Sequence, residues 1–356
     1  MERGTVAVYE QRAREWRARR PARFEDRARA LAAAVPHGAL RADLGCGPGL
    51  HLPLLGRPVL ALDAAEAMLR LAREAAPDAW CVRADLEHLP LRAGALRGAW
   101  ARASLLHVPA VRLPDTLREL HLATSVGAPI ALTMLAGDGD GLLDDDDFPG
   151  RFFSCWQPDR LADVLVGAGF DVEECALVTD GEWIAVRMTR ARTLADTVGS
   201  GMRLLVCGLN PSIYAADRGV GFARPGNRFW PAALAAGILS RDRDPAHALA
   251  HHGIGMTDLV KRATTGAGEL TVGEYRAGAA RVRRLVEWLQ PRAVCFVGLA
   301  GWRAAVDRRA VAGVRPDGFG GRPAYVMPNS SGLNAHATPA ILAEHLRAAA
   351  ALADSA

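Results

Sequence analysis

One polar side chain in the second half of the chain is placed where it could contact a bound ligand. Asn210 stands in the segment GLNPS, residues 208–212, directly after an apolar run that predicts a buried strand. Ligands of open α/β sheets bind at the carboxyl ends of strands, which is where this amide would lie. An amide has no usable basicity, so Asn210 can orient a water molecule but cannot deprotonate it. For this segment alone, an asparagine that caps a turn is the competing interpretation.

Two apolar residues lie in loops that give them no obvious place in a core. Phe222 belongs to GFARPGNRFW, residues 221–230, and an exposed ring there is suited to stacking on a planar base. Leu333 belongs to the polar segment PNSSGLN, residues 328–334. Its side chain is suited to fill the gap that an extruded base leaves in a duplex. A loop leucine that packs into the core is the alternative.

The charge of the chain is distributed unevenly between its halves. From Arg203 onward there are 19 basic and 11 acidic residues, a net charge of +8, whereas the 24 basic and 28 acidic residues before it give −4. A basic half is the electrostatic footprint of a partner that carries phosphates. Within it, Arg224 and Arg228 are equally consistent with phosphate contacts and with solvated side chains.

A glycine-rich turn marks a second candidate site in the first half. The segment DLGCGPG, residues 43–49, follows an apolar run, and its glycines would let the backbone turn tightly and approach a ligand. Asp63 ends the next strand-like run, about 20 residues on, where a carboxylate accepts hydrogen bonds from ribose hydroxyls. Asp85 ends the third run, within reach of an adenine. His107 is equally consistent with a base beside the reacting group and with a structural histidine.

The elements that must position these residues alternate between strands and helices, a pattern typical of parallel α/β sheets. In the first half, strands are predicted at 41–46, 58–63, 79–85, 128–135, 170–178 and 182–189, and helices at 64–75, 113–123 and 158–167. In the second half, strands are predicted at 203–208, 293–298 and 324–328, and helices at 227–237, 272–289 and 339–352. We therefore expect two α/β domains, residues 1–190 and 202–356, joined by a polar linker at 191–201.

Composition excludes several classes of protein. The six cysteines are scattered without a C-x-x-C pair, which indicates reduced thiols, a cytoplasmic location and no metal site. No apolar run approaches the roughly 18 residues of a membrane helix, so we expect a soluble protein without a membrane partner. Residues 1–40 are rich in arginine but also carry acidic residues. They predict an exposed amphipathic helix rather than a signal or transit peptide.

The glycine-rich turn, Asp63, Asp85 and the segment ARASLLHVPAVRLPDTLRELH, residues 101–121, together resemble class I S-adenosylmethionine-dependent methyltransferases over about residues 9–190. The resemblance implies a Rossmann-like sheet with S-adenosylmethionine as cofactor. The cofactor-binding residues it implies are Asp43, Gly45, Gly47, Gly49, Asp63 and Asp85. The methyl acceptor is unknown, because the position after the fourth strand lacks the Pro-Pro-aromatic motif of enzymes that methylate amines of DNA. A domain retained only for packing is the alternative.

The segments GLNPS, GFARPGNRFW and PNSSGLN, with GIGMTDLVKRAT between them, resemble the mismatch-specific uracil/thymine-DNA glycosylases of the uracil-DNA glycosylase superfamily. The resemblance implies a parallel sheet flanked by helices, in which Asn210 holds the attacking water, Phe222 stacks on the flipped base and residues 329–333 enter the duplex. The base pocket and DNA contacts it implies are Gly208, Pro211, Ser212, Phe222, Asn329, Ser331, Gly332 and Leu333. Ser212 stands where the family often has glycine, and Ala335 where it has a basic residue.

The sequence thus predicts a bifunctional protein. One half would excise uracil, and with it thymine or ethenocytosine, from mismatches with guanine in double-stranded DNA, as a step of base-excision repair that needs no cofactor. The other would transfer methyl groups to an unknown acceptor. Two alternatives stay open: the second half binds damaged DNA without chemistry, or it only delivers the methyltransferase to nucleic acid. The oligomeric state and the preference between uracil and thymine are not assigned.

Overall fold

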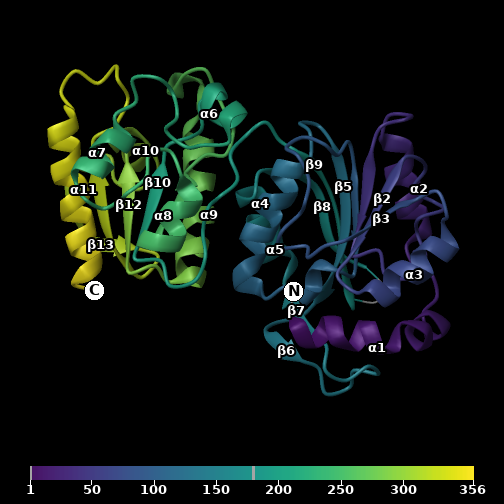
Figure 1. Cartoon of the computed structure of the whole chain (residues 1–356). Helices are drawn as coiled ribbons and strands as arrows, with labels where there is room; N and C mark the ends of the chain where they lie inside the picture. The colour runs from purple at the N-terminus through teal and green to yellow at the C-terminus, as the bar shows by residue number, and fades with distance from the viewer. Residues whose placement is uncertain (1, 179–180) are drawn as a thin grey trace. The chain divides into compact units, whose positions relative to one another are not determined.

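The computed structural model describes residues 2–178 and 181–356, and the chain divides into two compact units (Figure 1). The first unit comprises Met1–Val166 and Phe170–Ala191, and the second comprises Gly167–Gly169 and Arg192–Ala356. Each unit is a sheet covered by helices, so the α/β class predicted for both halves is confirmed. Among the described residues, no helix has the length and hydrophobicity that crossing a membrane requires.

The first unit is built on a mostly parallel sheet with strand order β3-β2-β1-β4-β5-β7-β6, and β9 adds to β5 in antiparallel register and carries β8 at the edge. The central strands are buried along their whole length, as β1 and β2 show. Its strands are β1 Arg41–Leu44, β2 Val59–Asp63, β3 Trp80–Arg83, β4 Ala99–Arg102, β5 Pro129–Ala136, β6 Asp140–Leu142, β7 Phe152–Trp156, β8 Phe170–Val178 and β9 Trp183–Arg190.

The helices of the first unit include two in the arginine-rich N-terminal region, where the sequence predicted one. The first of them packs against α3 through Ala13, Met68 and Leu71, with Tyr9 and Trp16 beside this cluster (Figure 1). The helices are α1 Arg3–Arg19, α2 Glu25–Ala34, α3 Glu66–Ala75, α4 Leu113–Ala123 and α5 Pro158–Gly167, with short 3-10 turns at Leu105–His107 and Ala110–Arg112.

The second unit is built on a five-stranded sheet of order β11-β10-β12-β14-β13. Its first four strands are parallel, but β13 pairs with β14 in antiparallel register, so the sheet is not wholly parallel as the sequence predicted. The strands are β10 Leu204–Gly208, β11 Ile254–Asp258, β12 Ala293–Val297, β13 Gly313–Phe319 and β14 Arg322–Met327. Because β10, β11, β12 and β14 run the same way, their carboxyl ends meet at one edge of the sheet.

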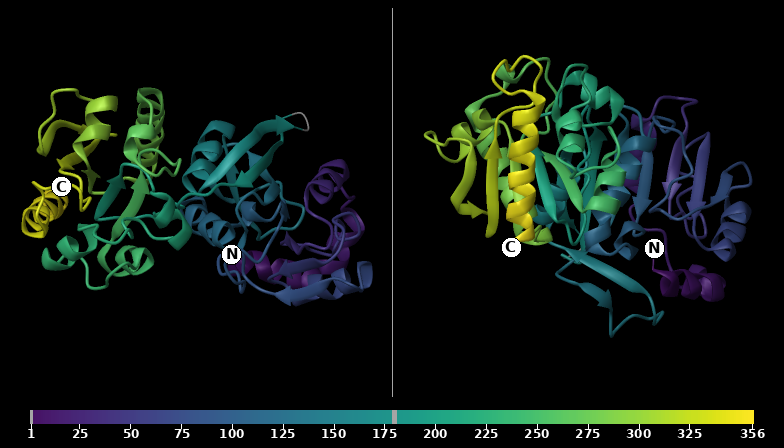
Figure 2. Two further views of the ribbon diagram at one scale, coloured as in Figure 1. Left: turned by 90° about the horizontal axis from the view of Figure 1, so that it is seen from above. Right: turned by 60° about the vertical axis from the view of Figure 1, so that its left-hand side comes forward.

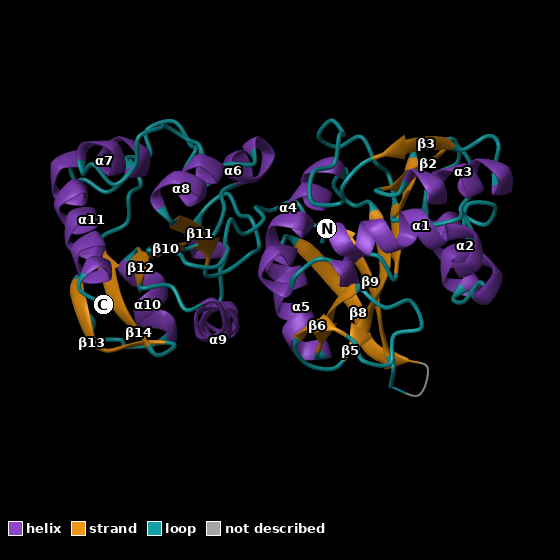
Figure 3. Cartoon of the chain, turned by 60° about the horizontal axis from the view of Figure 1, so that its bottom comes forward, coloured by secondary structure: helices purple, strands orange, loops and turns teal. Residues whose placement is uncertain are grey.

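Helices cover both faces of this sheet (Figure 3). On one face, α11 lies along the strands (Figure 2) and packs with α7 around the buried rings of Phe229 and Trp230. On the other face, α9 and α10 bury Val282, Val286 and Trp302. The helices are α6 Ile213–Arg218, α7 Phe229–Ala235, α8 Pro245–His252, α9 Val272–Leu289, α10 Leu299–Ala305 and α11 Pro339–Asp354, with a 3-10 turn at Ala267–Glu269.

The polar stretch that the sequence suggested as a linker, residues 191–201, is instead packed into the second unit from Arg192 onward. Thr197 exchanges two backbone hydrogen bonds of 2.8 Å with Met256 of β11. The carboxylate of Asp196 is buried between Lys261 and Arg281, at 2.8 and 2.9 Å. The polar composition of this stretch does not indicate that its buried carboxylate is paired in the interior.

Candidate functional sites

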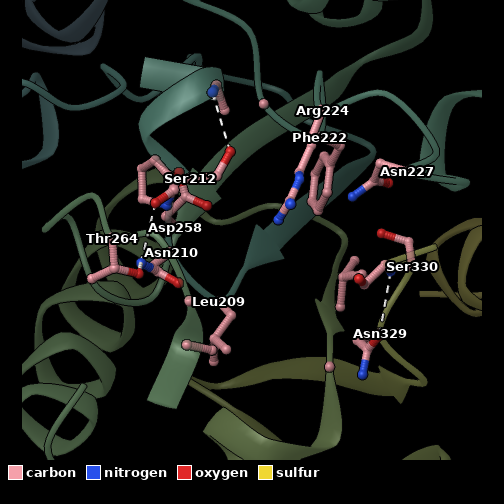
Figure 4. Close-up of a pocket in the computed structure, with 18 of the residues that line it drawn as sticks. Leu209, Asn210, Ser212, Phe222, Arg224, Asn227, Asp258, Thr264, Asn329 and Ser330 are labelled. Atoms are coloured by element: carbon pink, nitrogen blue, oxygen red, sulfur yellow. Dashed lines mark hydrogen bonds between the residues drawn. The ribbon is translucent and has the colours of Figure 1, made fainter. Parts of the chain in front are cut away.

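A cavity of about 510 Å³ opens at the edge of the second unit where the parallel strands end. Figure 4 shows Asn210 and Thr264 on one side of it and Phe222 with Arg224 on the other. Asn210 lines it, together with six of the eight residues predicted for the base pocket and the DNA contact: Pro211, Ser212, Phe222, Asn329, Ser331 and Leu333. The structure therefore brings together side chains that are more than 100 positions apart in the sequence.

The side chain of Asn210 is held in one orientation. Its Nδ2 group lies 2.8 Å from Thr264 Oγ1, 3.0 Å from the carbonyl oxygen of Arg262 and 3.1 Å from that of Pro211. Because carbonyl oxygens only accept hydrogen bonds, the nitrogen must face them and the Oδ1 atom must face away. Oδ1 is thereby presented on the cavity side of the loop (Figure 4), where it can accept a hydrogen bond from water.

A carboxylate that the sequence did not single out also lines this cavity. Asp258 is the last residue of β11 and pairs in register with Gly208 of β10. Burial raises the pKa of Asp258 to about 6; Lys261 lowers it in part, and Asp196 adds to the rise. A carboxyl with such a pKa is matched to accept a proton near neutral pH. The rule that selected Asn210, a polar residue at the carboxyl end of a core strand, would have found Asp258 had β11 been predicted.

The ring of Phe222 packs against the core and also lines the cavity. One face stacks on Phe229, with ring centroids 4.2 Å apart and an interplanar angle of 21°. The backbone of Phe222 is in the left-handed region, at φ 57°, which costs a residue other than glycine about 1–2 kcal/mol. A bulky residue in this conformation indicates that the position of the ring matters more than local stability.

Leu333 is 88% exposed, at the tip of the loop between β14 and α11. It does not pack into the core, which removes the structural alternative for this side chain. Arg228 holds this loop in place. Its guanidinium donates hydrogen bonds to the carbonyl oxygens of Asn334, Ala337 and Gly332, at 2.9, 2.8 and 3.2 Å. Arg228 is therefore a support of the loop, whereas Arg224 is exposed and lines the cavity.

The remaining predicted residues of this site have structural positions. Ser212 accepts a hydrogen bond of 3.2 Å from the backbone N–H of Ala215 and so caps α6, while it also lines the cavity. Gly208 and Gly332 are not among the lining residues. Gly208 lies between the Asp258 carboxylate and the Phe222 ring, and Gly332 packs against the backbone of Gly226.

The glycine-rich turn of the first unit borders a separate cavity, lined by Asp43, Gly45, Gly47 and Asp63 among others. Gly45, at φ 71°, lies so close to Ser104 that a Cβ atom on it would be 2.3 Å from Ser104 Cβ. Asp63 accepts hydrogen bonds from the backbone N–H groups of Gly47 and Ala65, at 2.8 and 2.9 Å. Burial raises the pKa of Asp63 to about 6 in spite of these bonds.

These residues fit S-adenosylmethionine, a nucleoside that carries an ammonium, a carboxylate and a sulfonium group. Oδ2 of Asp43 is buried without a hydrogen-bond partner. Burial, together with the charge of Asp63, raises the pKa of Asp43 to about 8. An unpartnered carboxyl of this kind is suited to a cationic ligand, because a positive charge would favour its ionised form. Asp63, at the end of β2, retains lone pairs for ribose hydroxyls.

Two of the predicted cofactor residues do not line this cavity. Asp85 accepts a hydrogen bond of 3.0 Å from the backbone N–H of Glu87, and Gly49 packs against Ala72 of α3. His107 does line it, but both ring nitrogens are engaged, Nδ1 with the carbonyl oxygen of Phe152 at 2.6 Å and Nε2 with the Tyr9 hydroxyl at 2.7 Å. Since the carbonyl requires a proton on Nδ1, Nε2 accepts a hydrogen bond from the Tyr9 hydroxyl. Burial lowers the pKa of His107 to about 4, so it is a neutral support for Tyr9.

Several solved structures are similar to this chain in part. An S-adenosylmethionine-dependent methyltransferase from Mesorhizobium loti is 23% identical, over 45% of this chain and 96% of that one, with a TM-score of 0.37. The CcbJ methyltransferase from Streptomyces caelestis is 17% identical, over 54% of this chain and 100% of that one, with a TM-score of 0.43. A methyltransferase from Thermotoga maritima, described as a possible histamine N-methyltransferase, is 16% identical, over 52% and 99%, with a TM-score of 0.41.

Models of two protein families match separate parts of the chain. The methyltransferase-domain model matches residues 42–129, which include the glycine-rich turn, Asp63 and Asp85. The model of the uracil DNA glycosylase superfamily matches residues 196–351, which include the whole cavity lined by Asn210, Asp258 and Leu333 except for Leu194. This chain therefore carries a uracil DNA glycosylase superfamily domain at residues 196–351 and a methyltransferase domain at residues 42–129.

Proposed function

We propose that the second unit is a DNA glycosylase that hydrolyses the N-glycosidic bond of uracil mispaired with guanine in double-stranded DNA. The observation that carries this proposal is the convergence of Asn210, Phe222 and Leu333 on one cavity. A water-orienting amide, an aromatic ring and an exposed apolar side chain are the parts that removal of a flipped base requires. Mispaired bases unstack at lower cost than paired ones, which favours a mismatch as substrate.

In the proposed reaction, the flipped uracil stacks on the free face of Phe222 while Leu333 fills the space it left in the duplex. A water molecule donates a hydrogen bond to Asn210 Oδ1 and so faces C1′ of the deoxyribose. The oxygen of this water bonds to C1′ as the bond from C1′ to N1 of uracil breaks. The electron pair of the broken bond leaves with the base, and solvent then protonates the uracil anion.

Asp258 is the proton acceptor in this proposal. Asn210 cannot take a proton from water, whereas the Asp258 carboxylate lines the same cavity and is ionised above its pKa of about 6. The proton of the attacking water passes to this carboxylate and from there to solvent. A positioned base of this type contributes about 10²- to 10⁴-fold to a rate.

Excision assays on the full chain test the proposal. Purified protein is incubated with duplexes that carry uracil, thymine or ethenocytosine opposite guanine, and abasic sites are then cleaved with alkali. We expect strand scission at uracil that is lost in Asn210→Ala. Tight binding to the G·U duplex without any scission would show a damage-binding module and would overturn the glycosylase.

For the first unit we propose S-adenosylmethionine-dependent methyl transfer to a separate acceptor. Specific support comes from the buried, unpartnered Oδ2 atom of Asp43 beside the turn that holds Gly45 and Gly47. When bound, the cofactor supplies an electrophilic methyl group. Asp43 and Asp63 bind and orient it, and Tyr9, held by His107, closes one side of the cavity. Calorimetric titration with S-adenosylhomocysteine tests this: we expect binding by the full chain and its loss in Asp63→Ala.

A further inference from the structure

A third cavity, of about 410 Å³, adjoins the proposed cofactor cavity within the first unit. The two share Tyr9, Trp16, Arg102, Ala103 and His107 as lining residues. This volume lies within the range of small-molecule sites, roughly 300–1,000 Å³. A ligand here would sit next to the cofactor, which is the place that a methyl acceptor must occupy.

Arg102, the last residue of β4, lines both cavities and has no polar partner. No hydrogen bond or ion pair joins its guanidinium to any residue that the structure describes, and its Nε group is buried without an acceptor. Its central carbon lies 6.0 Å from the ring centres of Phe24 and Trp183. These contacts leave the N–H edges of the guanidinium unused, although a half-buried arginine normally satisfies several of its five donors.

Most other cations around this cavity are neutralised by the protein itself. Arg151 is paired with Asp146, Arg20 with Asp147 and Arg19 with Glu15. Arg23 lies 3.8 Å from Glu182. Arg102 is thus the lining cation without an ion-pair partner among residues 2–178 and 181–356. Burial lowers the pKa of Arg102 and the charges of Arg23 and Arg20 add to this effect, whereas Tyr9 and Asp43 offset it in part.

The walls of the cavity favour a flat ligand. Trp16, Phe153 and Trp183 contribute aromatic side chains to the lining, and such surfaces bind planar groups by stacking. The planar fork of an arginine matches a carboxylate with two parallel hydrogen bonds. A partly buried arginine without a hydrogen bond or ion pair, such as Arg102, destabilises the free protein. Its presence therefore indicates a ligand that supplies an anion to it.

We propose that this cavity binds a planar, carboxylate-bearing small molecule as methyl acceptor, with its carboxylate held by Arg102. The role as acceptor rests on the cofactor site proposed above, but the binding of the carboxylate does not. A volume of about 410 Å³ is enough to hold a small molecule of this kind.

Calorimetric titration of the full chain with benzoate and with benzamide, its neutral counterpart of the same shape, tests the assignment. We expect benzoate to bind the wild type, and Arg102→Met to weaken it by about 10- to 100-fold, the loss typical of a hydrogen-bonded charge pair. Benzamide should bind weakly and equally to both proteins. Arg187→Met, which removes an exposed arginine of β9 outside the cavity, is the matched control and should bind benzoate as the wild type does.

Absence of benzoate binding, or equal binding of benzoate to wild type and Arg102→Met, would overturn the proposal. Tighter binding of phenyl phosphate than of benzoate would overturn the choice of a carboxylate. The thermal midpoint without ligand supplies an independent readout, since removal of an unpartnered buried charge should raise it. A lower midpoint in Arg102→Met would show that the arginine supports the fold instead.

The same titrations separate this proposal from the cofactor site. Asp63→Ala should lose S-adenosylhomocysteine but bind benzoate as the wild type does, because Asp63 lines the cofactor cavity and not the third cavity. Benzoate binding without S-adenosylhomocysteine binding would refute the methyltransferase and leave the carboxylate site intact. The reverse pattern would refute the carboxylate site alone.

Discussion

Gly208 and Asp258 are register partners on the neighbouring parallel strands β10 and β11, and a Cβ atom on Gly208 would lie 2.5 Å from Asp258 Oδ1. The same atom would be 3.3 Å from Cζ of Phe222. The absence of a side chain at Gly208 thus lets a carboxylate and an aromatic ring approach the same strand end. Gly208 was predicted for the site from the sequence, whereas Asp258 was not.

Gly208→Ala should therefore impair excision much more than folding. The added methyl group must push the Asp258 carboxylate aside, and displacement of a reacting group by about 1 Å costs roughly 100-fold in rate. Single-turnover excision from a G·U duplex measures the effect, with thermal unfolding as the test of the fold. Gly268→Ala is the matched control, because a Cβ atom there meets no neighbour and the residue does not line the cavity. Equal rates in both variants would contradict the close approach described here.

The pH dependence of excision should report Asp258. Its carboxyl must be ionised to accept a proton, so the rate should rise with pH and level off above about 6. Asp258→Asn should be slower by about 100-fold or more and should lose this dependence. Asp317→Asn, at an exposed position of β13, is the control and should keep the wild-type profile. An Asp258→Asn variant with the rate and profile of the wild type would remove the residue from the mechanism.

The sequence predicted the loops of the second site better than its strands. Asn210, Phe222 and Leu333 stood out because polar or apolar side chains occupied positions that ordinary turns do not explain. The strand β11 was not predicted, because its sequence, Ile-Gly-Met-Thr-Asp, includes a glycine and a threonine that weaken the apolar pattern. Asp258 was missed with it.

Other features depend on tertiary contacts that no local pattern reveals. Arg228 could not be assigned because its partners are backbone carbonyl oxygens about 105 positions away, as the bonds to Asn334 and Gly332 show. The unpartnered state of Arg102 is likewise visible only when the surrounding charges are placed. Helix α9, by contrast, was predicted to the residue, because amphipathic spacing is a local signal.

The orientation of the Asn210 amide should depend on Thr264. The Thr264 hydroxyl lies 2.8 Å from Asn210 Nδ2, and its loss would leave only the carbonyl oxygens of Pro211 and Arg262 to hold the amide, which would then be less firmly oriented. Thr264→Val keeps the shape and removes the bond, so we expect roughly fivefold slower excision at unchanged DNA affinity, in keeping with ~1 kcal/mol for one neutral hydrogen bond. Thr264→Ser should restore the rate. A rate loss in the serine variant equal to that in valine would point to packing rather than to hydrogen bonding.

Leu333→Ala should separate duplex from single-stranded substrates. The side chain is exposed in the free protein, so its truncation should leave the unfolding midpoint unchanged. In a duplex it would lose apolar contact worth about 1.5–3 kcal/mol, roughly 10- to 100-fold in excision. Single-stranded uracil should be excised at the wild-type rate. Val311→Ala, at another exposed apolar position of the second unit, is the control, and equal losses on both substrates would exclude a wedge.

The buried Asp196 should be the main anchor of the segment that enters the second unit. Although burial alone would raise the pKa of Asp196, Arg281 and Lys261 hold it below its ordinary value. The stabilisation that these ion pairs give is thus present above the unfolded-state pKa of Asp196, 3.8, and is lost as the pH falls below it.

At neutral pH, Asp196→Asn leaves Lys261 and Arg281 without their counter-charge, which should cost about 3–5 kcal/mol of unfolding free energy. Urea titration measures this, and Asp217→Asn, which breaks the exposed pair with Arg192, should cost less than about 1 kcal/mol. If both variants unfold at the same urea concentration, the segment is held by its backbone pairing with β11 and not by its charges.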